Sequence, residues 1–157
     1  MRTLIRGGRL LDPAMKTDTE ADLLIEDGVI IDSGPGLDAA GAEIIDASGC
    51  WVAPGFVDMH THLREPGQEY KEDIRSGGRA AAAGGFTSVA CMANTTPVND
   101  DPSVTKFIID QARKHSPVRV YPVAAATIGL AGEVMTEMSA LREAGAVAFS
   151  DDGRGTE

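Results

Sequence analysis

Two histidines separated by one residue, His60 and His62, are the residues best suited to chemistry in this chain. Successive side chains of an extended strand point to opposite faces, so these two imidazoles would project from the same face, about 7 Å apart at their α-carbons. Such a pair can hold one metal ion. Pairs of this spacing also occur by chance in exposed strands, so the spacing alone leaves both interpretations open.

The residues around the pair favour the metal site. Residues 51–57 are apolar and rich in strand-forming types, Asp58 follows on the face of the histidines, and residues 64–67 form a turn. A strand that leaves a core and delivers histidines and then an arginine at its carboxyl end is typical of the mouth of a parallel barrel, where such folds carry their sites.

A metal site of this kind needs a third protein ligand, because catalytic zinc typically takes three and a water molecule. Asp151 and Asp152 follow a predicted strand and offer a carboxylate. If Val147 and Phe149 face the outer helices, Asp152 lies in phase with the residues that face the barrel interior. We therefore choose Asp152 over Asp151 as the ligand. The alternative is that Asp-Asp-Gly only forms a turn.

Arg64 and Asn94 are candidates for binding a substrate. Arg64 lies two residues beyond His62, and a guanidinium near a metal can bind a carboxylate through two hydrogen bonds. Its alternative is a surface salt bridge with Glu65 or Glu72. Asn94 ends a predicted strand and could donate its amide to the same carboxylate, although an asparagine before a turn is more often a cap.

Residues 1–53 are predicted to form a small all-β, sandwich-like unit without catalytic residues of its own. Its strands are short and separated by turns. Asp27-Gly28 predicts a hairpin between residues 21–25 and 29–32, because this dipeptide is typical of two-residue turns.

From residue 54 onward, strands and helices alternate. Beyond the histidine strand, we predict strands over residues 86–94, 118–125 and 146–150, and helices over residues 69–84, 103–115 and 133–144. Four parallel strands with crossover helices predict an α/β fold, the first half of a (β/α)₈ TIM-like barrel over residues 54–157. A complete barrel needs about 250 residues, so we expect exposed strand edges.

The composition bounds the function classes. Apolar residues make up 43% and charged residues 24%, which predicts an ordered globular chain. The net charge of -10, without a cluster of Lys and Arg, argues against nucleic acid or membrane as partners. No apolar run approaches the roughly 18 residues of a membrane span, and no leader is evident, so we expect a cytoplasmic protein. Cys50 and Cys91 lack metal-binding spacing and are expected to be buried free thiols.

Taken together, the motifs resemble those of dihydroorotases, in the cyclic amidohydrolase superfamily. The matching segments are residues 54–67 (PGFVDMHTHLREPG) with Lys71-Glu72, residues 82–89 (AAGGFTSV), residues 92–97 (MANTTP) and residues 150–153 (SDDG). The resemblance implies one or two zinc ions, with His60, His62 and Asp152 as ligands, and a substrate carboxylate bound by Arg64 and Asn94. It implies the reversible cyclisation of N-carbamoyl-L-aspartate to L-dihydroorotate in pyrimidine biosynthesis.

The chain departs from this family in one respect. The family draws further histidine ligands and a catalytic aspartate from later barrel strands, which would lie beyond Glu157, so no general acid or base is identified here. We therefore expect the N-terminal portion of a dihydroorotase that turns over poorly or not at all by itself. The resemblance further implies a small-molecule substrate, and either a homodimer or an association with aspartate carbamoyltransferase.

Two other functions compete with this interpretation. An allantoinase or dihydropyrimidinase usually carries a carboxylated lysine after the third barrel region, whereas no lysine follows Lys114. A non-catalytic dihydroorotase-like partner of aspartate carbamoyltransferase tends to lose its metal ligands, whereas His60, His62 and Asp152 are present. The sequence favours the catalytic dihydroorotase over both.

Overall fold

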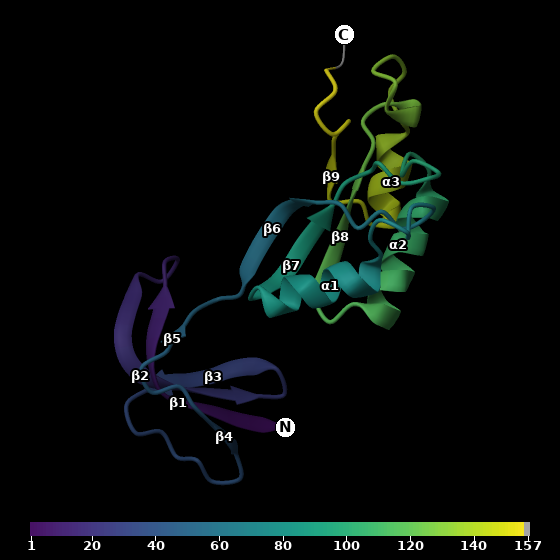
Figure 1. Cartoon of the computed structure of the whole chain (residues 1–157). Coiled ribbons are helices and arrows are strands. Elements are labelled where there is room, and N and C mark those ends of the chain that lie inside the picture. Colours follow the sequence, from purple (N-terminus) through teal and green to yellow (C-terminus); the bar gives the residue numbers. More distant parts are fainter. Residues whose placement is uncertain (156–157) are drawn as a thin grey trace. The chain divides into compact units, whose positions relative to one another are not determined.

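The computed structural model describes residues 1–155 and divides the chain into two compact units, Met1–Pro54 and a second that begins at Gly55. The sequence prediction places this boundary after residue 53. The N-terminal unit, purple to blue in Figure 1, contains only strands among its regular elements. These are β1 (Arg2–Asp12), β2 (Thr17–Glu26), β3 (Val29–Gly34), β4 (Glu43–Asp46) and β5 (Trp51–Val52).

The strands of the N-terminal unit form one mixed sheet. Their order is β3-β2-β1-β4, with β5 also paired to β1. The β1–β2 and β2–β3 pairs are antiparallel, whereas β4 and β5 run parallel to β1. Leu4 and Leu24 are directly opposite each other and are both buried, so this cross-strand pair lies in the core of the unit.

The hairpin predicted at Asp27-Gly28 is present between β2 and β3. Asp27 has a φ of 50° and Gly28 a φ of 81°. Positive φ at both central residues matches the turn type whose twist suits two antiparallel strands. The dipeptide therefore determines this connection locally.

The second unit is a four-stranded parallel sheet in the order β6-β7-β8-β9. Its strands are β6 (Phe56–Thr61), β7 (Phe86–Cys91), β8 (Arg119–Ala124) and β9 (Ala148–Phe149). The helices α1 (Ile74–Ala83), α2 (Pro102–His115) and α3 (Met138–Ala144) connect them, with a 3₁₀ turn, η1 (Ile128–Leu130), before α3 (Figure 1). The predicted α/β fold of half a (β/α)₈ barrel is confirmed.

The main core of this unit lies between the sheet and the first two helices. It contains Leu63, Ile74, Val89, Cys91, Val104, Ile108, Ala112 and Val120. Burial raises the pKa of the Cys91 thiol to about 12, so this cysteine is an unreactive core residue. Cys50 is also a free thiol, but it is exposed, so the expectation that both cysteines are buried was wrong for Cys50. A smaller cluster joins Leu141 of α3 to Ala124, the last residue of β8, and to Ala146, which lies two positions before β9. The two clusters thus include the last residues of β7 and β8, Cys91 and Ala124.

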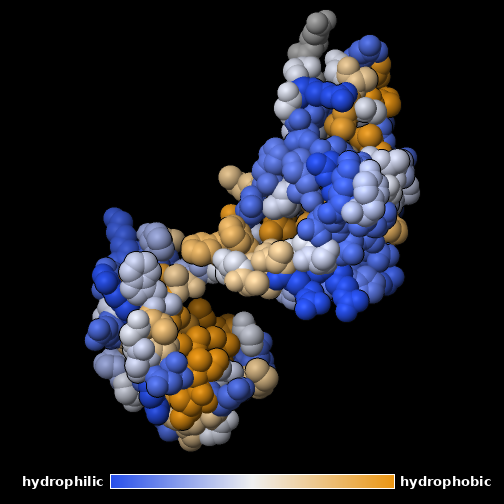
Figure 2. Space-filling view, in the orientation of Figure 1, coloured by the Kyte–Doolittle hydropathy of each residue, from blue (hydrophilic) through white to orange (hydrophobic). Residues whose placement is uncertain are grey.

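The expected exposed strand edges are present. Within residues 1–155, β6 and β9 each pair with one neighbour. Three apolar side chains of β6 are largely exposed: Phe56 (62%), Val57 (63%) and Met59 (80%). Figure 2 shows further apolar surface on the visible face of the N-terminal unit, whose exposed large apolar residues include Val29, Ile30, Ile44 and Trp51.

All three helices differ from their predicted limits at the N-terminal end. α1 begins at Ile74 instead of residue 69, because Asp73 caps it and forms a reciprocal capping box with Ser76. α2 begins at Pro102, capped by Asp101. α3 begins at Met138 instead of residue 133. No helix among the described residues is long and apolar enough to cross a membrane.

The Asp73 cap generates a prediction about stability. The Asp73 carboxylate accepts a hydrogen bond from the Ser76 backbone N–H at 2.6 Å. Replacing Asp73 with Ala removes this acceptor, and we expect the free energy of unfolding to fall by about 1 kcal/mol at neutral pH. Urea unfolding measures the change, and a variant as stable as the parent would show that the cap contributes nothing.

The same cap should respond to acid. Hydrogen bonds from the backbone N–H and hydroxyl of Ser76 lower the pKa of Asp73. Its stabilising effect is therefore complete above the ordinary carboxyl pKa of about 4 and is lost as pH falls through the lower folded-state pKa. Asp73→Asn is the control, because asparagine caps a helix equally well but has no carboxyl group to protonate. This variant should keep its stability at neutral pH and should not lose the contribution of the cap in acid.

Candidate metal centre

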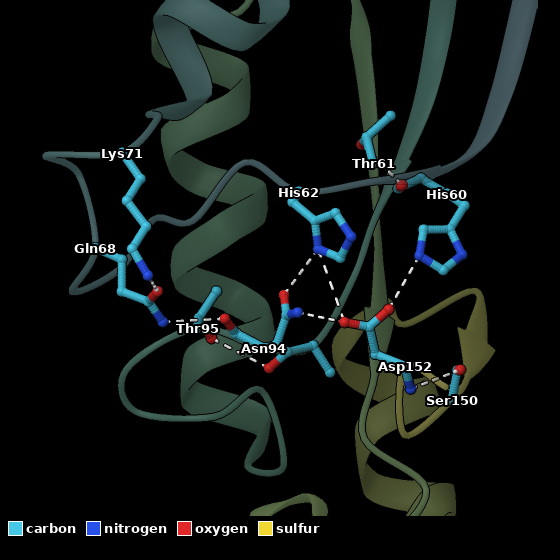
Figure 3. A network of polar contacts seen from close by, with 11 residues as sticks. His60, Thr61, His62, Gln68, Lys71, Asn94, Thr95, Ser150 and Asp152 are labelled. Atoms are coloured by element: carbon cyan, nitrogen blue, oxygen red, sulfur yellow. Dashed lines mark hydrogen bonds and ion pairs between the residues drawn. The ribbon is translucent and has the colours of Figure 1, made fainter. Parts of the chain in front are cut away.

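The structure brings the three predicted metal ligands together at the carboxyl edge of the parallel sheet (Figure 3). His60 belongs to β6, His62 follows it, and Asp152 lies in the turn after β9. One ligand atom from each side chain lies within 4.8 Å of the other two. His60 Nε2 is 3.0 Å from Asp152 Oδ1, and His62 Nδ1 is 3.9 Å from Asp152 Oδ2.

This donor set fits a zinc ion. Two imidazole nitrogens and one carboxylate oxygen are the ligand types of catalytic zinc sites. Zinc bonds of about 2.1 Å with tetrahedral angles place neighbouring ligand atoms roughly 3.4 Å apart. The two distances from the imidazoles to the Asp152 carboxylate, 3.0 and 3.9 Å, lie on either side of this value. The His60 side chain is 57% exposed and the Asp152 side chain 16%, so the centre is open to solvent on the His60 side.

The turn after β9, rather than strand alternation, determines the direction of Asp152. Phe149 packs against the cluster that contains Leu141 of α3, as the predicted phase requires, but Val147 is 56% exposed, whereas that phase requires it to be covered by a helix. The strand ends at Phe149, and Asp152 has a left-handed φ of 53° with its N–H donated to Ser150 Oγ at 3.1 Å. Asp152 therefore lies where the sequence predicted, but the turn conformation places it there and strand alternation does not.

The neighbouring Asp151 is buried and faces a different set of groups. Its Oδ1 accepts hydrogen bonds from the backbone N–H groups of Ala126 and Thr127, each at 2.9 Å, and its Oδ2 accepts from Thr127 Oγ1 at 2.5 Å. Desolvation raises the pKa of Asp151, but these hydrogen bonds outweigh it and the net pKa is lowered. The two adjacent aspartates therefore have separate partners.

Asn94 connects two of the candidate ligands. Its Oδ1 lies 3.1 Å from His62 Nδ1, and its Nδ2 donates a hydrogen bond to Asp152 Oδ2. The close-up in Figure 3 shows this carboxamide between the two side chains. Its contribution to binding a substrate carboxylate stays a prediction, since its polar atoms here face the ligands.

Arg64 is half-buried and has a left-handed φ of 61°. Within residues 1–155, its guanidinium forms no ion pair, so the predicted alternative of a surface salt bridge is not observed. Glu65 instead accepts from the Ile74 N–H at 3.0 Å, and Glu72 accepts from the Asp73 N–H at 3.1 Å. Non-glycine residues in this conformation cluster at functional sites, which suits a role for Arg64 at the centre.

Sequence reasoning missed the contacts that join the loop after β6 to the loop after β7. Gln68 Nε2 donates to the Asn94 carbonyl at 3.1 Å and to Thr96 Oγ1 at 3.2 Å, and Lys71 Nζ donates to Gln68 Oε1 at 3.0 Å. The Thr96 N–H also donates to the Pro66 carbonyl at 2.9 Å. The nearest signal in the sequence is the pair of Pro-containing turns that follow the two strands.

The close approach of these loops predicts the effect of a substitution at Gly67. This residue has a φ of +89°, and a Cβ there would lie 1.9 Å from the Thr96 carbonyl oxygen. Gly67→Ala should therefore add a backbone clash to the conformational cost of about 1–2 kcal/mol. Gly129→Ala is the matched control, because its φ is +65° with nothing within 4 Å. Equal losses of unfolding free energy in the two variants would contradict the close approach.

Comparison with known proteins gives a consistent result. Residues 49–157 match the family model described as Dihydro-orotase-like. The dihydroorotase of Pelobacter propionicus is 56% identical over 155 residues, 98% of this chain and 37% of that protein. The dihydroorotase of Geobacter sulfurreducens is 56% identical over 155 residues, 98% of this chain and 36% of that protein. The chain thus spans little more than a third of the length of these curated relatives.

Similar solved structures have the same architecture. The L-hydantoinase (dihydropyrimidinase) of Arthrobacter aurescens has a TM-score of 0.78 at 26% identity, covering 94% of this chain and 32% of its own. The dihydropyrimidinase of Brevibacillus agri has a TM-score of 0.69 at 31% identity, covering 81% of this chain and 28% of its own.

Proposed function

The chain belongs to the dihydroorotase-like family, and we propose that it supplies the His-His-Asp part of a dihydroorotase active site. The reaction is the zinc-dependent, reversible cyclisation of N-carbamoyl-L-aspartate to L-dihydroorotate. The observation that carries this proposal is the convergence of His60, His62 and Asp152 on one point at the carboxyl edge of the sheet. Curated relatives at 52–56% identity that are named dihydroorotase support it.

The residues of the centre have two kinds of role, metal binding and substrate binding. Zinc held by His60, His62 and Asp152 would polarise the ring carbonyl of the substrate and would lower the pKa of a bound water molecule to near 7. The two imidazoles provide neutral nitrogen ligands, and Asp152 provides a negative charge that offsets part of the charge of the ion. Arg64 binds the substrate carboxylate through two hydrogen bonds. Asn94 donates to the same carboxylate once its amide turns from Asp152 toward the substrate.

No residue of the described chain is assigned as the general acid or base for the ring nitrogen. Asp151 is the nearest further carboxylate in the sequence, but its oxygens already accept three hydrogen bonds from Ala126 and Thr127. A proton-transfer group has to reach the reacting atom directly or through one water molecule. This chain contributes binding and metal-ligating groups to the proposed reaction.

Hydantoinase or dihydropyrimidinase activity is the main rival. The solved structures with these names share 26–34% identity with the chain, well below the 52–56% of the dihydroorotases. Arg64, two residues beyond the candidate ligand His62, also favours a substrate with a carboxylate, which dihydroorotate has and a simple hydantoin ring lacks. A homodimer, an association with aspartate carbamoyltransferase and a cytoplasmic location stay predictions from the sequence.

A chimeric enzyme tests the proposed function. The matching 155-residue segment of the Geobacter sulfurreducens dihydroorotase is replaced with that of this chain. We expect a zinc-dependent enzyme that interconverts dihydroorotate and N-carbamoyl-L-aspartate. His60→Ala in the chimera should lower kcat/KM by about a thousandfold, because losing metal assistance removes several kcal/mol of transition-state stabilisation.

The control for this experiment is His115→Ala, which removes an exposed histidine at the end of α2 and should leave activity unchanged. A folded chimera that hydrolyses dihydrouracil or hydantoin but not dihydroorotate would contradict the proposal in favour of the rival. So would dihydroorotase activity that survives the loss of His60.

A further inference from the structure

We propose that Asp151 is the positioning residue of the metal centre. In this role its hydrogen bonds hold the turn after β9 against the loop after β8. They thereby determine the position of the Asp152 carboxylate relative to the two histidines. The inference rests on the proposed function, because it concerns the same centre. It assigns to Asp151 a task distinct from metal ligation.

The first support is the number and burial of the contacts that Asp151 makes. The residue is 5% exposed, and its carboxylate accepts hydrogen bonds from two backbone N–H groups and one hydroxyl, all from Ala126 and Thr127. Thr127 is 1% exposed, and its Oγ1 also accepts from the Gly132 N–H at 2.9 Å. Asp151 therefore anchors the turn to a second ordered loop rather than to solvent.

The second support is that sheet pairing does not hold Asp152, whose own hydrogen bonds are to Ser150 in the same turn and to Asn94 in the loop after β7. β9 contains two residues and ends three positions before Asp152, so sheet pairing does not extend to the ligand. Asp152 itself is held in a left-handed conformation, with φ of 53°. Short turns in such conformations persist only where their surroundings fix them, and the hydrogen bonds of Asp151 are the buried, charged contacts adjacent to Asp152.

The geometry also explains why Asp151 is not the ligand. Its side chain lies outside the group formed by His60, His62 and Asp152. Turning it toward the histidines would leave the partly buried N–H of Ala126 and the buried N–H of Thr127 without their acceptor, which is unfavourable. The adjacent aspartates thus have different partners, the loop after β8 for Asp151 and the two histidines for Asp152.

Zinc affinity of the full 157-residue chain tests this role. The dissociation constant is measured by competition with a chromophoric chelator, and the coordination geometry by the visible absorption of the cobalt(II)-substituted protein. Asp151→Asn places an amide nitrogen, a donor, where an oxygen now accepts. We expect about tenfold weaker zinc binding, the lower end of what the loss of supporting contacts costs, and altered cobalt bands.

Variants of Thr127 provide a second route that keeps the carboxylate in place. Thr127→Val removes one donor to Asp151 and should shift both readouts in the same direction, whereas Thr127→Ser should restore them. Thr105→Val is the matched control. Thr105 lies on α2, and its equally buried hydroxyl donates to Asn99 Oδ1 at 2.7 Å. This variant should lower thermal stability without changing zinc affinity or the cobalt spectrum.

The outcomes separate the two proposals. If the unmodified chain binds no zinc, the proposed metal centre fails and this inference fails with it. If the unmodified chain binds zinc and folded Asp151→Asn binds it equally well with the same cobalt spectrum, only the positioning role is overturned. If Asp151→Asn does not fold, the comparison of Thr127→Val with Thr127→Ser and Thr105→Val decides, and equal zinc affinities there overturn the inference.

Discussion

The candidate metal centre depends on the contact between the Asp152 carboxylate and the imidazoles of His60 and His62. The sequence separates the aspartate from the histidines by three helices and three strands, and only the parallel sheet brings them together. Carboxyl ends of parallel strands meet at one edge, so side chains that follow different strands can converge without long loops. The buried core beneath that edge keeps the strands in register and makes the convergence a property of the fold.

Precise placement of the ligands comes from the loops rather than from the strands. On one side, Gln68 and Thr96 join the loops after β6 and β7 around Asn94, whose amide touches both His62 and Asp152. On the other side, Asp151 joins the turn after β9 to Thr127. A metal centre requires its ligands to be held within about half an ångström, and backbone-anchored hydrogen bonds provide such support.

The sequence predicts well what depends on local pattern. The Asp27-Gly28 turn follows from turn chemistry and the four parallel strands from periodicity. The rule that strand ends share an edge predicts the proximity of Asp152 to the histidines, although strand alternation, used to choose Asp152 over Asp151, does not determine its direction. The predicted start of α1 was wrong by five residues, because the helix is capped at Asp73, whereas the predicted helix began at residue 69. The partners of Asp151 and Gln68 could not be predicted, because they come from other loops whose approach is decided by tertiary packing.

X-ray absorption at the zinc edge of the zinc-loaded chain shows whether His60, His62 and Asp152 bind one ion. We expect one tightly bound zinc ion surrounded by nitrogen and oxygen donors, with the multiple-scattering pattern of two imidazoles. That pattern should be reduced to one imidazole by His62→Ala. Sulfur scattering from the exposed Cys50, or an imidazole pattern unchanged in the variant, would contradict the convergence of His60, His62 and Asp152 on a single ion.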